Sequence, residues 1–238
     1  MKKLLHILAL LACLAVPAAS AVAGTGRPLL VAVAANFAPA MAEIGARFTG
    51  RTGIPVQTTV SSSGRLYAQI RNRAPFSLFL SADTRRPQLL FEQGFCRRPE
   101  IYVRGRTVLW SRDPKQCRRA GDWKRLVASA ARTTIPNPEL APYGAAARQA
   151  LVSSGLWEKV AGRLVYGANV AQSFQYAASG ATTVSFISRS LAATATGAGG
   201  CFLPVPEAEP VAQAACVITT SPAGDAALAL LRFLRRDS

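Results

Sequence analysis

The stretch Leu29-Leu30-Val31-Ala32-Val33-Ala34-Ala35-Asn36 decides the fold of this chain. Its seven consecutive apolar residues predict a short strand that is buried on both faces, as the strands of parallel sheets are. Beyond Asn36, large apolar residues recur at spacings of four, three and four, at Phe37, Met41, Ile44 and Phe48. That spacing predicts a helix with one apolar stripe, and Asn36 has the side chain that caps a helix start. The stretch is therefore expected to be a strand–helix unit.

The same alternation continues on the C-terminal side of this unit. Further short apolar runs predict strands at 54–60, 76–80, 102–110, 133–135, 164–166, 183–187 and 211–220. The segments between them have helical periodicity, the last helix is expected at 223–235, and the small residues of 192–200 predict a loop. Strands that alternate with helices in this way are typical of an α/β fold with parallel sheets.

On the N-terminal side, the chain begins as a secretory signal peptide does. Met1-Lys2-Lys3 is a positive start, an apolar stretch runs from 4 to 16, and the small residues Ala21 and Ala23 precede Gly24. This pattern predicts export with cleavage after Ala23, and hence a periplasmic protein. The apolar stretch is too short to cross a bilayer, which takes about 20 residues. Lipoprotein processing at Cys13 is the alternative.

Composition narrows the function classes. The 238 residues are half hydrophobic and carry a net charge of +16, so the chain is too apolar for a disordered basic tail. Cleavage would remove Lys2, Lys3 and His6, which lowers the charge to +14 and leaves no histidine. A Ser-His-Asp or Cys-His catalytic group and a His-ligated metal site are then excluded. The arginine pairs are scattered without interleaved aromatic residues, so no nucleic-acid partner is expected.

Four cysteines would remain after cleavage: Cys96, Cys117, Cys201 and Cys216. In an exported chain they predict two disulfides. Their spacings of 21 and 15 residues favour Cys96–Cys117 and Cys201–Cys216 among the three possible pairings. A zinc site is the rival interpretation, but the spacings contain no C-x-x-C pair.

Small and polar residues occupy four of the predicted strand-to-helix turns: Ala35-Asn36, Ser62-Ser63-Gly64, Pro142-Tyr143-Gly144 and Asn169-Val170. A helix start presents free backbone N–H groups and the positive end of the helix dipole, so it can bind an anion. Ligands of open α/β sheets bind at these strand ends. The alternative is that Asn36, Ser63 and Asn169 are only helix caps, a role that is compatible with anion binding.

These turns lie in motifs that resemble the periplasmic molybdate-binding proteins of ABC importers. The resemblance extends from residue 29 to about 190, and its motifs are VAANF (33–37), VSSSGRLYAQI (60–70), APF (74–76), LSAD (80–83), LAPYG (140–144) and GANVAQSF (167–174). It implies a type II periplasmic-binding-protein fold, in which two lobes, each a mostly parallel sheet flanked by helices, close like a Venus flytrap. Residues 24–106 with 206–238 would form the first lobe, and 107–205 the second.

The resemblance also implies the ligand and its partners. Molybdate or tungstate would be held by hydrogen bonds without a countercharge or cofactor and delivered to a membrane permease by a monomeric binding protein that is not an enzyme. The ligand-binding residues carried over by motif are Ala35, Asn36, Ser63, Tyr143 and Val170, with Ser62 as the alternative to Ser63. Ala35 has no hydroxyl and could donate only its amide.

Two other functions remain open at this point. The same fold could bind sulfate or phosphate, because sequence spacing defines the ion's surroundings only loosely. A hydrolase with Ser63 or Ser81 as nucleophile is the alternative from a different class. Neither serine lies in a G-x-S-x-G motif, and a lysine would have to serve as the base.

Overall fold

The apolar stretch at 29–36 forms the predicted strand and turn. β1 (Leu29–Ala34) is buried along almost its whole length, and α1 (Ala38–Thr52) follows with Met41, Ile44 and Phe48 on its buried face. The helix ends at Gly53, whose φ of 71° is a conformation that glycine adopts without strain. The residue at the helix cap is Phe37, and it makes no side-chain capping bond. The expectation that Asn36 caps α1 was therefore wrong.

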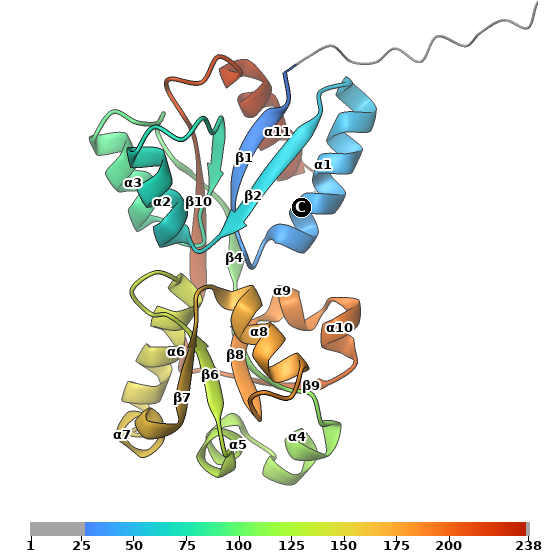
Figure 1. Ribbon diagram of the computed structural model, residues 1–238, viewed down its shortest axis with the longest axis vertical. Helices are drawn as coiled ribbons and strands as arrows, with labels where there is room; N and C mark the ends of the chain where they lie inside the picture. The colour runs from blue at the N-terminus through green and yellow to red at the C-terminus, as the bar shows by residue number, and fades with distance from the viewer. Residues whose placement is uncertain (1–26, 237–238) are drawn as a thin grey trace, which may run out of the picture.

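The computed structural model describes residues 27–236, which form two lobes around two five-stranded sheets (Figure 1). Lobe 1 is the first sheet with the helices that cover it. The strand order of this sheet is β2 (Val56–Ser61), β1, β3 (Leu78–Leu80), β10 (Val211–Val217) and β4 (Glu100–Gly105). Its helices are α1, α2 (Ser63–Arg71), α3 (Arg85–Glu92) and α11 (Gly224–Arg236).

Lobe 2 is the second sheet with its helices. Its strand order is β7 (Leu164–Gly167), β6 (Thr133–Pro136), β8 (Val184–Ser188), β5 (Thr107–Ser111) and β9 (Cys201–Pro204). The longer helices are α4 (Pro114–Ala120), α5 (Trp123–Ser129), α6 (Pro142–Ser153) and α8 (Val170–Ala178). One-turn helices are α7 (Trp157–Val160), η1 (Ala161–Arg163), α9 (Arg189–Ala192) and α10 (Ala195–Ala198).

The sheets are mixed, whereas mostly parallel sheets were expected. β1 pairs in parallel with β2 and β3, and β6 pairs in parallel with β7 and β8. β10 is antiparallel to β3 and β4, and β5 is antiparallel to β8 and β9. The antiparallel strands are those by which the chain enters or leaves a lobe, so their direction is set by the crossing and not by a strand–helix–strand unit.

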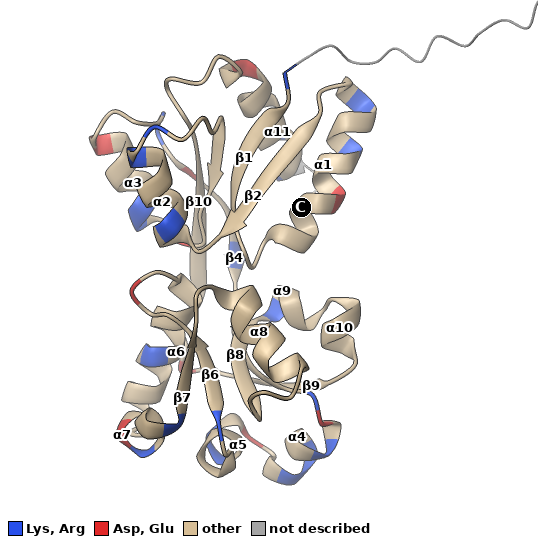
Figure 2. Ribbon diagram, viewed as in Figure 1, with Lys and Arg blue, Asp and Glu red and all other residues tan. Residues whose placement is uncertain are grey.

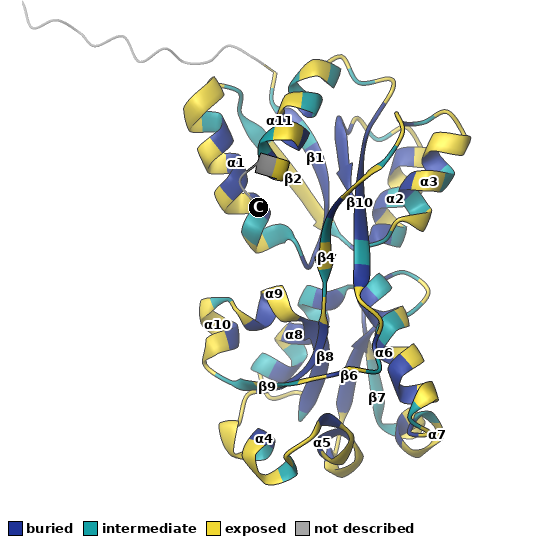
Figure 3. Ribbon diagram, turned by 180° about the vertical axis from the view of Figure 1, so that it is seen from behind, coloured by how far each residue is buried: buried dark blue, intermediate teal, exposed yellow. Residues whose placement is uncertain are grey.

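The strands of both sheets consist largely of buried residues (Figure 3), and apolar side chains pack against both sheets. In lobe 1, one core lies between the sheet and helices α1 and α11, and another lies on the opposite face under α2 and α3. In lobe 2, the largest core includes residues of α4 to α7. A further cluster joins Ala34, Ala35 and Ala82 of lobe 1 to Tyr143 and Val170 of lobe 2. The two lobes therefore share apolar contacts where they meet.

Two segments differ from the sequence-based expectation. The strand predicted at 102–110 is two strands, β4 and β5, which belong to different sheets and are separated at Arg106. The apolar pattern continues through this crossing and does not reveal it. The predicted loop at 192–200 contains α10, and the edge strand β9 that follows was not predicted.

The disulfide pairing also differs. Cys117 is bonded to Cys201, with Cα atoms 6.3 Å apart, so the expected Cys96–Cys117 and Cys201–Cys216 pairs were wrong. Cys96 and Cys216 are buried, unbonded and together in the lobe 1 core under α2 and α3. The chain crosses between the lobes twice, so cysteines that are near in sequence lie in different lobes. Distance along the chain therefore misleads here.

The predicted signal peptide at 1–23 lies outside the described residues. No helix in the part of the chain that the structure describes is long and apolar enough to cross a membrane. Within residues 27–236 there is also no group of histidine, cysteine or acidic side chains that could hold a metal ion. Lysine and arginine are spread over the helices of both lobes (Figure 2).

Candidate anion-binding site

A small cavity lies where the two lobes meet, at the carboxyl ends of β1, β2, β6 and β7. It is narrow and is lined by Ala34, Ala35, Asn36, Ser62, Ser63, Ala82, Ala141, Pro142, Tyr143, Asn169 and Val170. All five residues predicted to bind the ligand are in this lining, as is the alternative, Ser62. The structure thus brings together turns that are up to 135 residues apart between Ala35 and Val170.

The first turn contributes less than expected from Ala35 and more from Asn36. The Ala35 N–H donates to the Ser61 carbonyl at 3.0 Å, so it is not available to a ligand. Ala35 can therefore only line the cavity with its methyl group. The next N–H, that of Asn36, donates to no group among the described residues.

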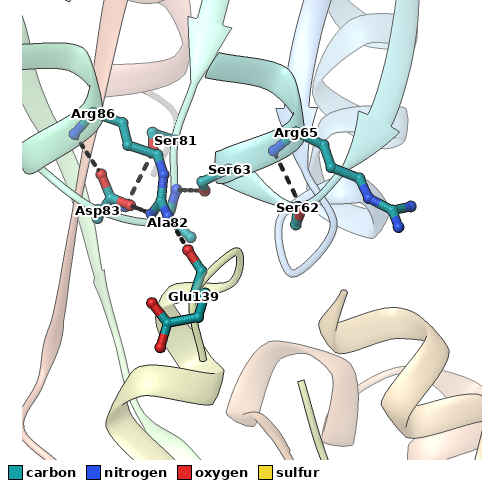
Figure 4. Close-up of polar contacts among 8 residues, drawn as sticks. All are labelled: Ser62, Ser63, Arg65, Ser81, Ala82, Asp83, Arg86 and Glu139. Carbon is teal, nitrogen blue, oxygen red and sulfur yellow. Dashed lines mark hydrogen bonds and ion pairs between the residues drawn. The ribbon is translucent and has the colours of Figure 1, made fainter. Parts of the chain in front are cut away.

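In the second turn, Ser62 and Ser63 have different roles. Ser62 caps α2, because its Oγ accepts from the Arg65 N–H, whereas Ser63 is the first residue of the helix (Figure 4). The Ser63 Oγ accepts from the Ala82 N–H at 2.9 Å. A hydroxyl that accepts in this way still has its own proton to donate. Ser63 therefore offers both a hydroxyl donor and a helix-start N–H.

Lobe 2 supplies two more helix starts. Tyr143 is the second residue of α6, and Val170 is the first residue of α8, whose cap Asn169 accepts from the Gln172 N–H at 2.9 Å. The first N–H groups of a helix have no partner inside it, and among the described residues Tyr143 and Val170 donate theirs to nothing else. Gly144 permits this placement, because a Cβ there would lie 2.1 Å from the Pro136 carbonyl oxygen.

The cavity is lined without any charged side chain. Its polar character comes from four free backbone N–H groups, the Ser63 hydroxyl and the positive ends of α2, α6 and α8. Such an arrangement stabilises an anion through neutral donors held on rigid elements. It contains no acid, base or activated nucleophile, and Ser63, the nucleophile considered above, has no base beside it in this lining.

A buried polar network lies next to the cavity. Gln213 of β10 contacts Asn36 at 2.8 Å, Tyr102 at 3.2 Å and Tyr143 at 3.2 Å through its side-chain amide. Burial raises the pKa of both tyrosines well above the ordinary value. Both phenols therefore stay protonated and can act as hydrogen-bond donors throughout the neutral range.

Several hydrogen bonds cross from one lobe to the other at the cavity. The Gly64 N–H donates to the Leu140 carbonyl at 2.9 Å, and the Ser190 hydroxyl donates to the Asn36 carbonyl at 2.9 Å. Arg86, which is paired with Asp83, reaches from lobe 1 to the Glu139 carbonyl at 2.7 Å (Figure 4). These contacts hold the lobes together over the cavity, so this is a closed form.

Sequence reasoning did not identify Gln213, Tyr102, Ser190 or Arg86. One signal for Gln213 was present, since it is the one polar residue in the otherwise apolar run 211–218. A polar residue in a buried strand needs a partner. Ser190 and Arg86 bond residues of the opposite lobe, and Tyr102 bonds Ser81 and Gln213, which are distant in the sequence. Local patterns carry no signal for such contacts.

Comparison with known proteins identifies the family. A family model described as bacterial extracellular solute-binding protein matches residues 29–238. The chain belongs to this family. As a solute-binding protein it acts by binding, and its two-lobe fold agrees with the fold class expected from its motifs.

Three relatives of this solute-binding protein are informative. The molybdate-binding protein ModA of Rhodobacter capsulatus is 36% identical over 230 residues, covering 96% of this chain and 88% of the relative. ModA of Azotobacter vinelandii is 37% identical over 210 residues, covering 86% and 83%. The solved periplasmic molybdate-binding protein of Azotobacter vinelandii superposes with a TM-score of 0.80 at 31% identity, covering 87% of this chain and 92% of that one.

The fold itself is shared more widely than the ligand. The sulfate-binding protein SubI of Mycobacterium tuberculosis superposes with a TM-score of 0.77 at 14% identity, covering 88% of this chain and 82% of that one. At that identity the likeness concerns the fold alone. The choice of ligand must therefore be argued from the cavity.

Proposed function

We propose that this solute-binding protein captures molybdate, and tungstate with it, between its lobes and delivers the ion to an ABC importer. The observation that carries the proposal is the convergence of unpaired donors from four turns on one cavity between the lobes that no charged side chain lines. Relatives with 36% and 37% identity are named molybdate-binding proteins, which supports the choice of ion.

Each donor has a defined part in the proposed complex. The N–H groups of Asn36 and Ser63 come from lobe 1, and those of Tyr143 and Val170 come from lobe 2. Ser63 adds its hydroxyl, while Ala35 and Ser62 form walls. Because a desolvated dianion is costly unless its oxygens are matched by donors, binding favours the closed form in which both lobes contribute.

Discrimination among oxyanions follows from size and protonation. Sulfate has shorter bonds to oxygen than molybdate, so in a cavity shaped for the larger ion its oxygens would lie too far from some of the donors. Hydrogen phosphate carries a proton that needs an acceptor, whereas the backbone N–H groups proposed to bind the ion can only donate. Sulfate and phosphate are therefore the competing ligands to test.

The same proposal includes location and partners. The protein is exported, its signal peptide is cut after Ala23, and the mature monomer works in the periplasm. The closed lobes present their joint surface to an inner-membrane permease. The first lobe consists of residues 24–106 with 206–238, and the second of residues 107–205. Closure bends the chain near residues 106 and 206, where it passes from one lobe to the other.

Calorimetric titration of the mature protein with molybdate, tungstate, sulfate and phosphate tests this function. We expect tight binding of the first two ions and at least about 100-fold weaker binding of the others, which corresponds to about 2.7 kcal/mol. Equal affinities for all four ions would remove the claim of selectivity. Tight binding of sulfate alone would assign the cavity to that ion.

A further inference from the structure

Among residues 27–236, Gln213 is the side chain that forms hydrogen bonds with ligand-site residues of both lobes. It lies on β10, is 2% exposed, and bonds Asn36 of lobe 1 and Tyr143 of lobe 2. The pairing of β10 with β4 changes register between Gln213 and Ala214, where Tyr102 of β4 has no partner residue on β10. Gln213 thus lies beside this irregularity and bonds the Tyr102 hydroxyl.

The surrounding structure is shaped for this contact. Gly105, at the end of β4, has no side chain, and a Cβ there would lie 1.9 Å from the Tyr143 Oη and 2.8 Å from the Gln213 Nε2. Any other residue at 105 would therefore displace the phenol or the amide. Gly105 is on β4 and Gln213 is on β10. These two paired strands of the first sheet are the ones that connect to lobe 2.

In the structure, the side-chain amides of Gln213 and Asn36 are oriented so that one buried oxygen has no hydrogen-bond partner. With the Gln213 Oε1 toward Asn36, the Asn36 Nδ2 donates to Gln213 and the buried Asn36 Oδ1 has no partner. The one Tyr102 proton is then shared between two acceptors, Gln213 and the Ser81 carbonyl. Buried polar atoms are rarely left unpaired.

Turning both amides by 180°, without moving the chain, pairs every polar group of this network except the Asn36 NH2 group. The Gln213 Nε2 then donates to the Asn36 Oδ1 and to Tyr102, which keeps its own proton for the Ser81 carbonyl. Tyr143 donates to the Gln213 Oε1. The Asn36 Nδ2 is left with two free protons beside the cavity that Asn36 lines.

We propose that Gln213 is a positioning and specificity residue, which holds the Asn36 side chain with its NH2 group toward the bound oxyanion. The inference rests on the proposed function of the cavity. By donating to the Asn36 Oδ1, Gln213 engages a buried acceptor that would otherwise be unpaired beside the cavity. A fully deprotonated oxyanion gains a donor from this arrangement, and hydrogen phosphate loses the acceptor that its proton needs.

The test compares Gln213→Glu, Gln213→Leu and the wild type by calorimetry with molybdate, sulfate and phosphate. An ionised glutamate only accepts, so it should turn the Asn36 Oδ1 toward the cavity. We expect Gln213→Glu to weaken molybdate binding by about 10- to 100-fold and to raise phosphate affinity relative to molybdate by about tenfold or more. Gln213→Leu should weaken molybdate binding without the relative gain for phosphate.

Gln175→Glu is the matched control, because it makes the same change on the exposed face of α8. It should bind all three ions as the wild type does. If Gln213→Glu lowers all affinities equally, Gln213 has only a structural role and the inference is wrong. Unchanged affinities in both Gln213 variants would also overturn it, whereas a wild type that binds no molybdate would overturn the proposed function instead.

A second measurement does not depend on the variants folding. In the wild type, the side-chain NH2 signals of Asn36 in a nitrogen–proton correlation spectrum should shift when molybdate is added. Triple-resonance assignment of the wild type identifies these signals. Asn36 signals that stay in place while backbone signals of Ser63 and Val170 move would contradict the proposed orientation for any oxyanion that the wild type binds.

Discussion

Ser62 and Ser63 are neighbours of the same type with different tasks. The Ser62 Oγ is engaged with the backbone of its own helix, and the Ser63 Oγ is fixed by the Ala82 N–H so that its proton is left over. The role of a serine hydroxyl in this turn therefore depends on whether it is at position 62 or at position 63. The pair offers a matched comparison, because both serines are almost fully buried beside the same cavity.

Ser63→Ala should weaken molybdate binding by about 1.5–3 kcal/mol, the range for a hydrogen bond to a charged group. Ser62→Ala should instead lower the stability of the protein by about 1 kcal/mol, because α2 loses its cap. Calorimetry and thermal unfolding of both variants separate the two effects. A larger loss of affinity in Ser62→Ala than in Ser63→Ala would exchange their roles.

Affinity should be independent of pH between about 6 and 9, because Tyr143 is the one titratable side chain in the lining and burial raises its pKa above this range. The free energy of unfolding should depend on pH on the alkaline side. Above about pH 10 the unfolded chain releases tyrosine protons that Tyr102 and Tyr143 retain in the folded state, so the free energy of unfolding falls as pH rises.

Titrations across this pH range, with alkaline denaturation as the second measurement, check both statements. Tyr102→Phe removes one of the two phenols and should reduce the alkaline loss of stability. A break in affinity between pH 6 and 9 would contradict the assignment of neutral donors.

At the scale of elements, the start of α2 both lines the proposed ligand site and contacts the opposite lobe. The helix presents Ser63 to the cavity, and its next residue, Gly64, meets lobe 2 through Leu140. A Cβ at Gly64 would lie 3.0 Å from the Leu140 Cα and carbonyl oxygen and 3.1 Å from the Arg86 guanidinium. A methyl group at this position would therefore crowd the contact between the two lobes.

Gly64→Ala should weaken molybdate binding by about 1–3 kcal/mol, because closure would crowd the new methyl group. The ligand-free protein should lose no stability once the lobes can separate, since alanine favours a helix over glycine by about 1 kcal/mol. Gly50→Ala is the control, because it lies in α1 with nothing within 4 Å of its Cβ, and it should leave affinity unchanged. Equal affinities in the two variants would show that Gly64 is not a closure contact.

Elements that depend on neighbouring residues could be predicted from the sequence. The alternation of apolar runs and helical stripes placed β1, β2, β3 and α1 close to where they occur, and the turns after them contain the residues that line the cavity. Periodicity and turn chemistry are local signals, and they were sufficient there. The resemblance of the motifs then indicated the family.

Features that depend on distant residues could not be predicted. The Asn36 side chain has the form of a helix cap, but it bonds Gln213, which is 177 residues away. The apolar run at 102–110 gives no sign that it leaves one sheet and enters another, because both β4 and β5 contain buried residues. Cysteine spacing failed for the same reason, since the chain path between lobes decides which cysteines meet.

At the scale of the whole molecule, the Cys117–Cys201 disulfide connects the two ends of lobe 2. It joins α4, which follows β5, to β9, the last strand of that lobe, across a separation of 84 residues. Cys96 and Cys216 lie outside this loop in lobe 1, where the Cys96 hydrogen bond and burial raise the pKa of Cys216. A thiol in that condition reacts slowly.

Replacing Cys117 and Cys201 together by serine should lower the free energy of unfolding by about 2–4 kcal/mol, because the unfolded chain regains the freedom that the closed loop removes. Differential scanning calorimetry of the oxidised wild type and the double variant measures the difference. Peptide mapping without reductant is the accompanying control. A peptide that joins Cys96 to Cys117 would contradict the pairing in the structure.

The order of strands in the first sheet has a consequence for how the protein would fold as it is exported. β10 is the strand between β3 and β4, and α11 covers the same lobe, yet both are made from the last 26 residues described. Lobe 2, by contrast, is complete once β9 has passed. A chain that crosses the membrane from its N-terminus can therefore fold its middle before its beginning. The first sheet cannot be completed until the end of the chain has crossed, because β10 is the strand that pairs with both β3 and β4.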